Sequence, residues 1–560
     1  MEDEKVTEKM ETTETTSTEN EKKNDVQERK SDVIECAIIL GLSLITMIVG
    51  ACIKNYNVAR WLFTFSFVFA GYEILYSIIV KLCKKSLVIE EIAVLASALV
   101  LLYLGEGVTS CLVVSGYALV GFIEKIFLWL SLKRADYLFA ASTYERDPEI
   151  KERLLSRAQN LKLLATEKPE TKINFTVSLI FNVATIALGL LVAFIPPLFK
   201  ISSYGSLLTG RWLPAGAIVV ALAQISSYAL AEFITYYSAI KGADEFGTRI
   251  NTFKALDRLA NVKRVVFDKT GVITDGTATV TKVVSSDVNK TLSLIAAAEQ
   301  GVNGKILSAI KIYAKENDLQ ISDYEMNDVK YLSGKGIIAK VANDSYVIGS
   351  SKLLKENGVT VTAETTEDSV IYVAENGDII GTVYVRYIDK TSFSGVMAEL
   401  KEDLGLTTTL LSADGLSTVD YYKKKYGFDN AVSGAGVDYK TSNVKADNAL
   451  YVGNGETDGE VLEKLDFAVC IGKSCGNGDV IDVEEDDERS VPRLLKLATR
   501  TQKKIKFCKI FSSVFKAAAI IGGVALSACG VGYLFVAPLI CIVADAIIYA
   551  VAMTNSSEAV

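Results

Sequence analysis

The chain has 560 residues, half of them hydrophobic, with a mean hydropathy of +0.29 and a formal net charge of −8. This balance predicts a membrane protein with sizeable soluble parts, and the negative charge argues against a nucleic-acid partner. Histidine is absent, which removes the commonest metal ligand and the commonest general base. The nine cysteines form no Cys-x-x-Cys pair, so we expect buried, reduced thiols rather than a disulfide framework.

Residues 1–32 consist mainly of Glu, Lys, Thr, Asn and Ser, a composition typical of a disordered tail. Eight apolar segments are long enough to span a bilayer as helices. They lie near 33–53, 59–80, 87–104, 109–131, 174–197, 213–239, 509–530 and 532–553. We therefore expect four transmembrane helices over 33–131, two with a stalk over 174–253, and two over 496–560.

Basic residues indicate which side of the bilayer each loop faces. Lys81, Lys84 and Lys85 follow the second segment and many Lys and Arg residues follow the fourth, whereas the turn near Glu106 has none. Because Lys and Arg gather in cytoplasmic loops, we expect both termini and the 240–508 insert to be cytoplasmic, in a multi-pass protein of the cell (plasma) membrane.

The most informative stretch of the insert is Val262–Gly276, VKRVVFDKTGVITDG. Its apolar run, Val265–Phe267, is typical of a strand buried on both faces of a parallel sheet. Asp268 follows at the carboxyl end, where such sheets bind ligands, and a carboxylate there can attack a phosphoryl group and form an aspartyl-phosphate. Thr270 carries no carboxyl group and would be a poor general acid, so a phosphoenzyme would persist. The alternative is a strand-to-loop turn capped by Asp268.

The letters Asp268-Lys269-Thr270-Gly271, followed by Ile273–Gly276, resemble the phosphorylation motif of P-type ATPases, normally DKTGTLT. Six helices, a soluble insert and two closing helices resemble the order in heavy-metal members, whereas a membrane-anchored soluble phosphatase would not need the last pair. The resemblance implies an α-helical membrane domain and an α/β HAD-like phosphorylation domain (254–283 and 388–495). It also implies an inserted α+β nucleotide-binding domain (284–387), with ATP and Mg²⁺ as cofactors.

Three further motifs follow in the family's order. Ser412-Ala413-Asp414 resembles the TGD motif with its glycine lost, and Lys440 matches the lysine that offsets phosphate charge. Gly453-Asn454-Gly455-Glu456-Thr457-Asp458 falls on GDGxND. Asn454 replaces the first Asp, a Mg²⁺ ligand, so we expect weaker Mg²⁺ binding, because this hard cation favours carboxylates. The residues implied at the Mg²⁺ site are Asp268, Thr270, Asn454 and Asp458.

The inserted domain departs further from the pattern. Gly334, Gly336 and Gly349 match glycines beside the adenine, where an absent side chain lets the base approach the backbone. The family's His-Pro pair falls on Asn303-Gly304, and its Asp-x-x-Arg falls on Tyr387 and Lys390. ATP affinity is therefore in question.

Residues 132–173 are amphipathic and helical in pattern. In the family this interval holds an actuator domain, whose TGE loop dephosphorylates the aspartate. Some forty residues are too few for such a domain, and TGE occurs nowhere in the chain. We expect a short helical stalk over 132–173, with a separate actuator-like protein as a candidate partner.

Alignment from Asp268 places the family's CPC metal-binding triplet on Gln224-Ile225-Ser226. Both thiolates and the proline that unwinds the helix are gone. Gln224 and Ser226 still offer oxygen, although interhelical hydrogen bonds are the simpler interpretation.

In the last two helices, Lys516 and Asp545 match a membrane lysine and aspartate of zinc- and cadmium-type members. An ionisable residue within a span is functional by default, but an ion pair between these two is an equal alternative. Glu124 and Glu106 could complete a polar pathway or simply reach the lipid interface.

Two hypotheses follow. In the first, the protein is an ATP-driven heavy-metal cation transporter of the zinc and cadmium type, which forms an aspartyl-phosphate at Asp268; the candidate catalytic residues are Asp268, Lys269, Thr270, Ser412, Asp414, Lys440 and Asp458. In the second, it is a degenerate pseudo-ATPase that acts as a membrane scaffold or regulator. Motifs that serve separate steps of the pump cycle have been lost, and these losses favour the second hypothesis slightly. A slow membrane-bound phosphatase is a third possibility, but Thr270 stands where such enzymes carry a general acid.

Overall fold

The structure is a computed structural model. It describes residues 2–554 except 84–85, 87, 167–174, 199–210, 225, 300–303, 333–334, 362–367, 448, 473–474, 476–478, 484–486 and 531. The chain divides into two compact units: a helical unit of residues 1–241 and 501–556, and a mixed unit of residues 242–500.

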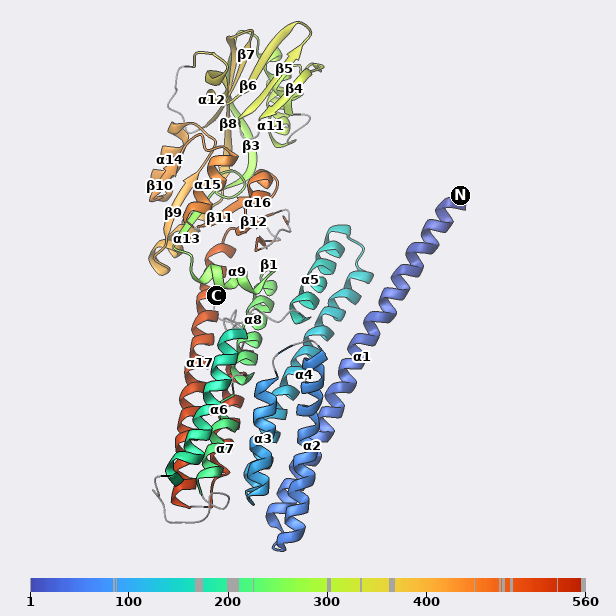
Figure 1. Ribbon diagram of the computed structural model, residues 1–560. Coiled ribbons are helices and arrows are strands. Elements are labelled where there is room, and N and C mark those ends of the chain that lie inside the picture. The colour runs from blue at the N-terminus through green and yellow to red at the C-terminus, as the bar shows by residue number, and fades with distance from the viewer. Residues whose placement is uncertain are drawn as a thin grey trace. The chain divides into compact units, whose positions relative to one another are not determined.

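The described part of the helical unit consists of α-helices (Figure 1). They are α1 (Glu2–Cys52), α2 (Tyr56–Cys83), α3 (Ile89–Tyr103), α4 (Gly107–Tyr144), α5 (Pro148–Thr166), α6 (Phe175–Leu198), α7 (Trp212–Leu222), α8 (Ser226–Glu245), α17 (Ser490–Cys529) and α18 (Val536–Met553). Within the described ranges, seven helical segments are long and apolar enough to cross a membrane. The third of our eight segments forms α3, which at 15 residues is shorter than the ~20 that a bilayer requires.

The N-terminal segment differs from the disordered tail that we expected. Helix α1 begins at Glu2 and continues without interruption to Cys52. Residues 1–32 contain neither proline nor glycine and are rich in Glu and Lys, which favour helix. Low hydrophobicity therefore excluded a packed core for this segment but did not exclude a helix.

Apolar side chains of the helical unit face both inward and outward. Small and branched residues of α2, α3, α4, α7, α17 and α18 form its core, among them Ala98, Leu101 and Ile218, all fully buried. Large residues such as Trp61 and Ile180 are two-thirds exposed. An outward apolar surface of this kind is expected where lipid replaces water.

The stalk that we predicted over 132–173 is helical where it is described. Helix α4 continues past the apolar segment to Tyr144, and α5 packs back against it. Among described residues 132–166 there is no strand, so this part of the chain holds no β-rich actuator domain.

The mixed unit contains the predicted parallel sheet. Its strand order is β1-β13-β12-β11-β2-β9-β10, and every neighbouring pair is parallel except β1 with β13. The strands are β1 (Thr248–Ile250), β2 (Arg264–Phe267), β9 (Thr407–Leu411), β10 (Asn430–Val432), β11 (Leu450–Asn454), β12 (Ala468–Ile471) and β13 (Ile481–Val483). The accompanying helices are α9 (Phe253–Ala260), α13 (Phe393–Ala398), α14 (Leu416–Tyr426), α15 (Val437–Asp447) and α16 (Gly459–Lys464), with a π-helical turn at Glu399–Asp403.

Strand β2 is buried on both faces, as its composition predicted. Val266 packs with Tyr451 and Leu462 on one face, and Phe267 meets the edge of Phe393 on the other, with ring centroids 5.4 Å apart. Both side chains are fully buried. The sheet therefore holds the start of the DKTG loop rigidly.

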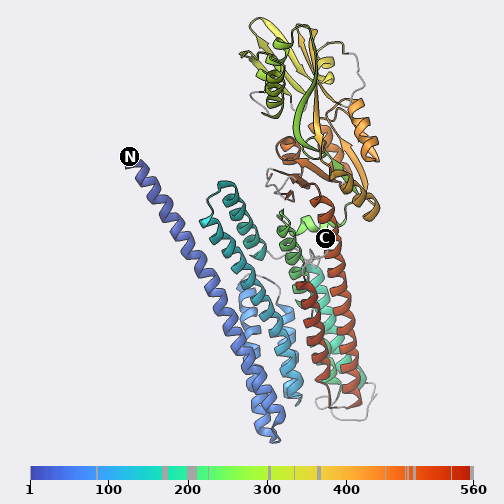
Figure 2. The same cartoon turned by 180° about the vertical axis from the view of Figure 1, so that it is seen from behind.

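A second, antiparallel sheet of order β3-β8-β7-β6-β5-β4 forms the inserted domain. Its strands are β3 (Thr274–Ser285), β4 (Asn327–Leu332), β5 (Gly336–Val341), β6 (Asp344–Gly349), β7 (Ser369–Glu375) and β8 (Asp378–Asp389), with α10 (Val288–Glu299), α11 (Gly304–Glu316) and α12 (Ser351–Glu356). Strands β3 and β8 pair along their length and run from one domain into the other (Figures 1 and 2). The predicted boundary at 283/284 is therefore late, because residues 274–283 already belong to the second sheet.

One cysteine expectation is wrong. Cys470 and Cys475 are paired as a disulfide, whereas the other seven cysteines are free. A search for Cys-x-x-Cys spacing misses this pair, because the two cysteines are five positions apart in the chain.

Candidate functional site

Three strand ends define the candidate active site. Strands β11, β2 and β9 are neighbours and parallel, so their carboxyl ends meet at one edge of the sheet. Asp268 follows β2, Asn454 ends β11 and Ser412 follows β9. The sheet order thus brings together the motifs that the sequence separates by up to 190 residues.

Asp268 lies in a buried charge cluster. The ammonium of Lys440 is 2.7 Å from Asp268 Oδ1 and 3.0 Å from Asp458 Oδ1, and all three residues are less than a tenth exposed. The Thr270 N–H donates to Asp268 Oδ2 at 3.1 Å, and the Tyr451 hydroxyl donates to Asp458. One cation between two carboxylates leaves this cluster with a net negative charge.

The charges shift each other's pKa. Burial raises the pKa of Asp458, the nearby Asp268 charge raises it further, and the Lys440 charge opposes both, which leaves it at about 6. Burial lowers the pKa of Lys440, but the two carboxylates outweigh burial and hold it above its ordinary range. Lys440 therefore remains an ammonium ion, whereas Asp458 changes charge in mildly acidic solution.

Asn454 braces the loop that follows Asp268. Its Oδ1 accepts the N–H groups of Glu456 and Thr457 at 2.9 and 3.3 Å, and its Nδ2 donates to the Gly271 carbonyl at 3.4 Å. Gly271 has φ of +76°, and a Cβ there would lie 2.8 Å from the Asn454 amide, so only glycine fits. An amide oxygen has two lone pairs, and both are in use.

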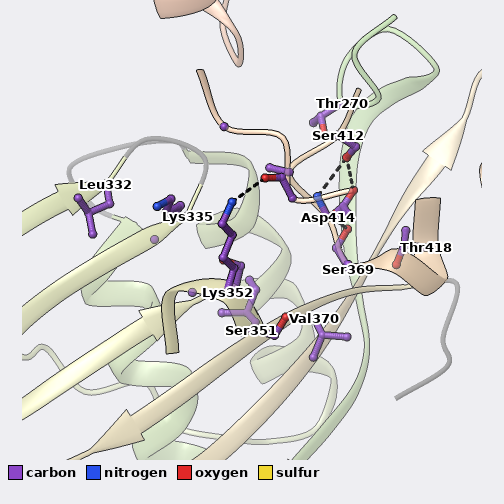
Figure 3. A pocket seen from close by; sticks show the side chains of 18 of the residues that line it. Thr270, Leu332, Lys335, Ser351, Lys352, Ser369, Val370, Ser412, Asp414 and Thr418 are labelled. Atoms are coloured by element: carbon purple, nitrogen blue, oxygen red, sulfur yellow. Dashed lines mark hydrogen bonds between the residues drawn. The ribbon is translucent and has the colours of Figure 1, made fainter. Parts of the chain in front are cut away.

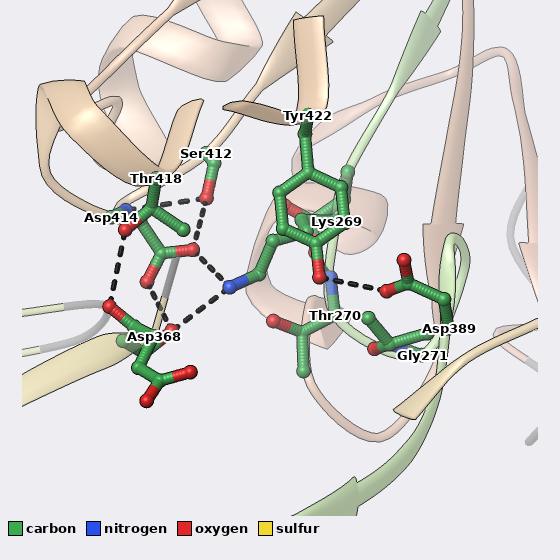
Figure 4. Close-up of polar contacts among 12 residues, drawn as sticks. Lys269, Thr270, Gly271, Asp368, Asp389, Ser412, Asp414, Thr418 and Tyr422 are labelled. Atoms are coloured by element: carbon green, nitrogen blue, oxygen red, sulfur yellow. Dashed lines mark hydrogen bonds and ion pairs between the residues drawn. The ribbon is translucent and has the colours of Figure 1, made fainter. Parts of the chain in front are cut away.

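Lys269 and Asp414 face each other instead of the Asp268 carboxylate (Figure 4). Their side chains form an ion pair, and Ser369 on β7 accepts from Lys269 Nζ at 2.9 Å and donates to Asp414 at 2.8 Å. Ser412 donates to the same carboxylate at 2.9 Å. Burial raises the pKa of Asp414, but the Lys269 charge and these hydrogen bonds outweigh it and lower the pKa below its ordinary value. This network joins the two domains of the mixed unit.

A cavity of about 1180 Å³ extends from Asp268, Thr270 and Lys440 to the second sheet. Figure 3 shows part of its lining, including Lys335, Lys352 and Ser412. The far end is lined by apolar side chains together with Gly336 and Gly349. These two glycines are opposite each other on β5 and β6, and a Cβ on either would lie within 2.2 Å of a backbone oxygen of the other strand. Close approach of the two strands therefore requires glycine at both positions, and both glycines also line the cavity where we predicted a base.

The structure separates some predicted nucleotide-binding residues from the cavity. Lys390 is not among the lining residues; its ammonium pairs with Glu488 at 3.2 Å and donates to the Gly271 carbonyl at 3.4 Å. Its assignment to the nucleotide stays a prediction, because the side chain is engaged with Glu488 and does not line the cavity. Tyr387, in contrast, lines the cavity. Asn303 and Gly334 lie outside the described residues.

Sequence reasoning missed Glu299, which also lines the cavity. Burial raises the pKa of its carboxyl to about 7, and its Oε2 has no hydrogen-bond partner among the described residues. Lys335 and Lys352 were missed as well. A carboxylate at the end of the apolar run LIAAAE is the only signal that could have indicated Glu299.

In the helical unit, the position matching the CPC triplet interrupts a helix although it has no proline. Helix α7 ends at Leu222 and α8 begins at Ser226. The Gln224 carbonyl accepts the Lys516 ammonium at 2.7 Å, and Ser227 Oγ accepts it at 2.5 Å. The Ser226 N–H donates to Glu90 at 3.1 Å. The predicted span over 213–239 thus consists of two helices, within the stretch Trp212–Glu245 that is long and apolar enough to cross a membrane.

The alternatives for this membrane cluster are partly resolved. No ion pair between Lys516 and Asp545 is present in the described helices; the lysine binds the interrupted helix instead. Among the described residues, Asp545 Oδ1 and Ser226 Oγ are buried without a hydrogen-bond partner, and the Gln224 amide, in the break, donates to the Ala221 carbonyl of α7. Glu124 lies on α4, which packs against α18. Buried oxygens without partners are costly and are available to a ligand.

The fold and site define a class of protein: a multi-pass membrane protein with an HAD-like domain, a buried aspartate at a strand end and an inserted domain over a shared cavity. Its overall fold is similar to that of a zinc-transporting PIB-type ATPase of known structure, with a TM-score of 0.55 and 16% identity over 93% of this chain and 99% of that chain.

Curated relatives point to the same class. A probable copper-exporting P-type ATPase of Archaeoglobus fulgidus is 28% identical over 48% of this chain and 34% of its own length. The cadmium, zinc and cobalt-transporting ATPase of Bacillus subtilis is 24% identical over 58% and 47%, respectively. The chain thus spans between a third and a half of the length of these relatives. No family model matches it. Its homologues are heavy-metal-transporting P-type ATPases, which confirms the resemblance seen in the DKTG motif.

Proposed function

We propose that the protein is an ATP-driven transporter of a divalent heavy-metal cation of the zinc and cadmium type, phosphorylated on Asp268. The observation that carries the proposal is the buried cluster of Asp268, Lys440 and Asp458 at one end of the 1180 Å³ cavity. Its location is proposed to be the cell (plasma) membrane, with both termini and the mixed unit in the cytoplasm, as the Lys-rich loops indicate.

In this function Asp268 Oδ1 or Oδ2 attacks the γ-phosphorus of ATP and the bond to ADP breaks. Lys440 already contacts the acceptor carboxylate at 2.7 Å, so its charge offsets the charge that gathers on the transferred group. The Thr270 N–H holds the second carboxylate oxygen, and the Ser412 hydroxyl lines the same cavity. Lys269 and Asp414 act as positioning residues, because they bind each other and Ser369.

The residues present fit Mg²⁺ in part. Asp268 and Asp458 supply adjacent carboxylate oxygens of the kind that Mg²⁺ binds. The Thr270 carbonyl accepts the Thr457 hydroxyl at 3.1 Å, and both Asn454 Oδ1 lone pairs are in use, so these two oxygens bind metal only by giving up a hydrogen bond. Bound Mg²⁺ would neutralise charge on the phosphates. Asp458 is the residue that we expect to hold it most strongly.

The cavity supports a nucleotide at its other end. Ile295, Ile337 and Ile348 give an apolar surface for a planar base. Lys335 and Lys352 line the same space and can meet phosphates. Glu299, whose pKa lies near neutrality, offers an unpartnered oxygen to a base edge. We propose that Glu299, Lys335 and Lys352 bind the nucleotide in place of the missing His-Pro pair and of Lys390.

The proposed cation path runs through the interrupted helix. Asp545 Oδ1, Ser226 Oγ and the Gln224 carbonyl are hard oxygen donors, and Lys516 occupies that carbonyl. A divalent cation would have to displace the Lys516 ammonium. Without the two thiolates, this site should hold zinc-type cations less tightly than a thiolate site.

A complete cycle also requires hydrolysis of the aspartyl-phosphate. Thr270 is not a general acid, and described residues 132–166 are helical only. We therefore propose that a separate actuator-like protein supplies the group that activates water. A pseudo-ATPase that acts as a scaffold or regulator is the alternative; the observation that favours it is the engagement of both Asn454 lone pairs at the Mg²⁺ position.

The test is metal transport by purified protein in sealed vesicles, with the nucleotide-binding side outward. We expect zinc or cadmium uptake that needs both ATP and an added actuator-like protein and that stops in Asp268→Asn. Asp275→Asn, an exposed change at the start of β3 seven residues after Asp268, is the matched control and should transport normally. Equal, ATP-independent leak in all three proteins would contradict the proposal and support the scaffold.

A further inference from the structure

A second group of metal-ligating side chains lies outside the phosphorylation cluster and outside the membrane helices. It consists of Cys470, Cys475 and Asp482, whose two sulfurs and one carboxylate oxygen lie within 4.8 Å of one another. Cys470 is on β12 and is opposite Asp482 on β13. Cys470 and Asp482 are almost fully buried, and Cys475 is half-buried.

The carboxylate is held towards the two sulfurs by its other contacts. Asp482 Oδ1 accepts the Cys475 N–H at 2.9 Å, and Oδ2 pairs with Arg249 on β1. These contacts orient the carboxylate so that one of its oxygens lies within 4.8 Å of both sulfurs. Such outer contacts typically fix the direction of a metal ligand.

We propose that the reduced pair Cys470 and Cys475, together with Asp482, binds one thiophilic divalent cation such as Zn²⁺ or Cd²⁺. Two thiolates with a carboxylate form a donor set that suits zinc-type metals in tetrahedral geometry, with water in the fourth position. The charges also balance: three negative groups are offset by Arg249 and a divalent ion. The phosphorylation cluster, by contrast, has no sulfur.

The disulfide seen in the structure is the metal-free, oxidised state of the same pair. Reduction by a trialkylphosphine breaks the S–S bond: the phosphine takes the oxygen of one water molecule and the sulfurs take its two protons. Metal binding then releases the two thiol protons, because only thiolates bind. The two states exclude each other, so oxidation should expel the cation.

A cation bound by Cys470, Cys475 and Asp482 would link neighbouring strands of the parallel sheet. Cys470 is opposite Gly453, the residue before Asn454, and Asp482 is opposite Arg249 on β1. A bound cation would therefore fasten β12 to β13, and through Arg249 to β1, beside the strand that carries Asn454. Strand β1 directly follows α8, and β13 precedes α17. The site thus lies where the chain enters and leaves the sheet.

The first test uses the full-length protein in detergent, reduced with the phosphine and titrated with Co²⁺. We expect near-ultraviolet thiolate-to-cobalt absorption that reaches a plateau at one equivalent and disappears in Cys475→Ser. Cys508→Ser, which removes a buried cysteine of α17, is the matched control and should keep the band. Asp482→Asn should weaken binding by at least ~10-fold. A band of equal size in Cys475→Ser, or no band in the reduced wild type, would overturn the proposal.

The second test needs no variant and so does not depend on whether a variant folds. Reduced wild-type protein is alkylated with and without Zn²⁺, and each cysteine is followed by mass spectrometry. We expect Zn²⁺, but not Mg²⁺, to slow alkylation of Cys475 by at least ~10-fold while the exposed Cys52 reacts unchanged. Equal protection of both cysteines, or of neither, would refute a site at this pair, as would a pair that stays oxidised in the phosphine.

Discussion

Replacement of Lys440 by methionine tests the charge cluster directly. Met keeps much of the volume of the side chain but removes the ammonium that contacts Asp268 at 2.7 Å and Asp458 at 3.0 Å. Two buried carboxylates then face each other without a cation. Removal of one partner of a buried ion pair typically costs about 3–5 kcal/mol, because the remaining charge is left uncompensated. We expect a loss of that size in the local stability around β2 and β11.

The loss should depend on pH, with a sign fixed by Asp458. Its pKa is raised from 3.8 to about 6 in the folded wild type, so ionisation opposes folding. Below pH 3.8 the carboxyl is protonated in both states and costs no stability. Between pH 3.8 and about 6 the cost of ionising it in the folded protein grows, and above about pH 6 this cost reaches about 3 kcal/mol, which corresponds to two pKa units. Without Lys440 the pKa rises further. Lys440→Met should therefore lose more stability at about pH 8 than at about pH 5.

Hydrogen exchange of the full-length protein, read on peptides that contain Asp268 or Asp458, measures this loss as a change in opening free energy. Lys464→Met is the matched control, because Lys464 pairs with Glu460 at 2.9 Å but is 43% exposed, and exposed ion pairs contribute little to stability. Added Mg²⁺ should restore part of the protection in Lys440→Met. If the two variants lose equal protection, or the loss does not change with pH, the cluster is not the buried charge balance described above.

Three other predictions concern the same site. Mg²⁺ affinity, measured by calorimetry, should fall about tenfold per pH unit below about pH 6, because the ion must then displace a proton from Asp458; a flat profile would show that Asp458 is not a ligand. Asn454→Asp should raise Mg²⁺ affinity by at least ~10-fold, because it adds a charged hard oxygen, and an unchanged affinity would contradict the position of Asn454 at the ion. Gly271→Ala should abolish phosphorylation, because its Cβ meets Asn454, whereas Gly405→Ala, at φ +64° with nothing within 4 Å, should only reduce stability by about 1 kcal/mol; equal activity in both would refute the clash.

The fold was largely readable from the sequence because its strongest signals are local. The apolar run before Asp268 could only be buried, and the long apolar segments could only be helices in lipid. What failed were features set by tertiary contacts. The break before Ser226 has no proline or glycine to announce it, and the Lys516 contact that satisfies the Gln224 carbonyl comes from a helix almost 300 residues away. The sheet of the inserted domain begins with β3 at Thr274, ten residues before the predicted domain start at 284.

The sequence predicted which residues gather at the site, but not the directions in which their side chains point. Motif order placed Asp268, Lys440 and Asp458 together, and the sheet explains why. Motif order could not show that Lys269 faces Asp414 or that Lys390 pairs with Glu488. It also could not reveal Glu299, since a lone carboxylate after an apolar run has no motif. Side-chain direction depends on which neighbours compete for each charge, and the sequence does not display those neighbours.

Phosphoenzyme formation tests the central claim most directly. Purified protein is given ATP labelled in the γ-phosphate with Mg²⁺, quenched in acid and compared with Asp268→Asn. We predict an acid-stable, hydroxylamine-sensitive label that is absent from the variant, because Asp268 lies beside Lys440 at the end of the nucleotide cavity. No label on folded wild-type protein, with and without zinc, or an equal label on the variant, would contradict the assignment of Asp268 as the phosphoryl acceptor.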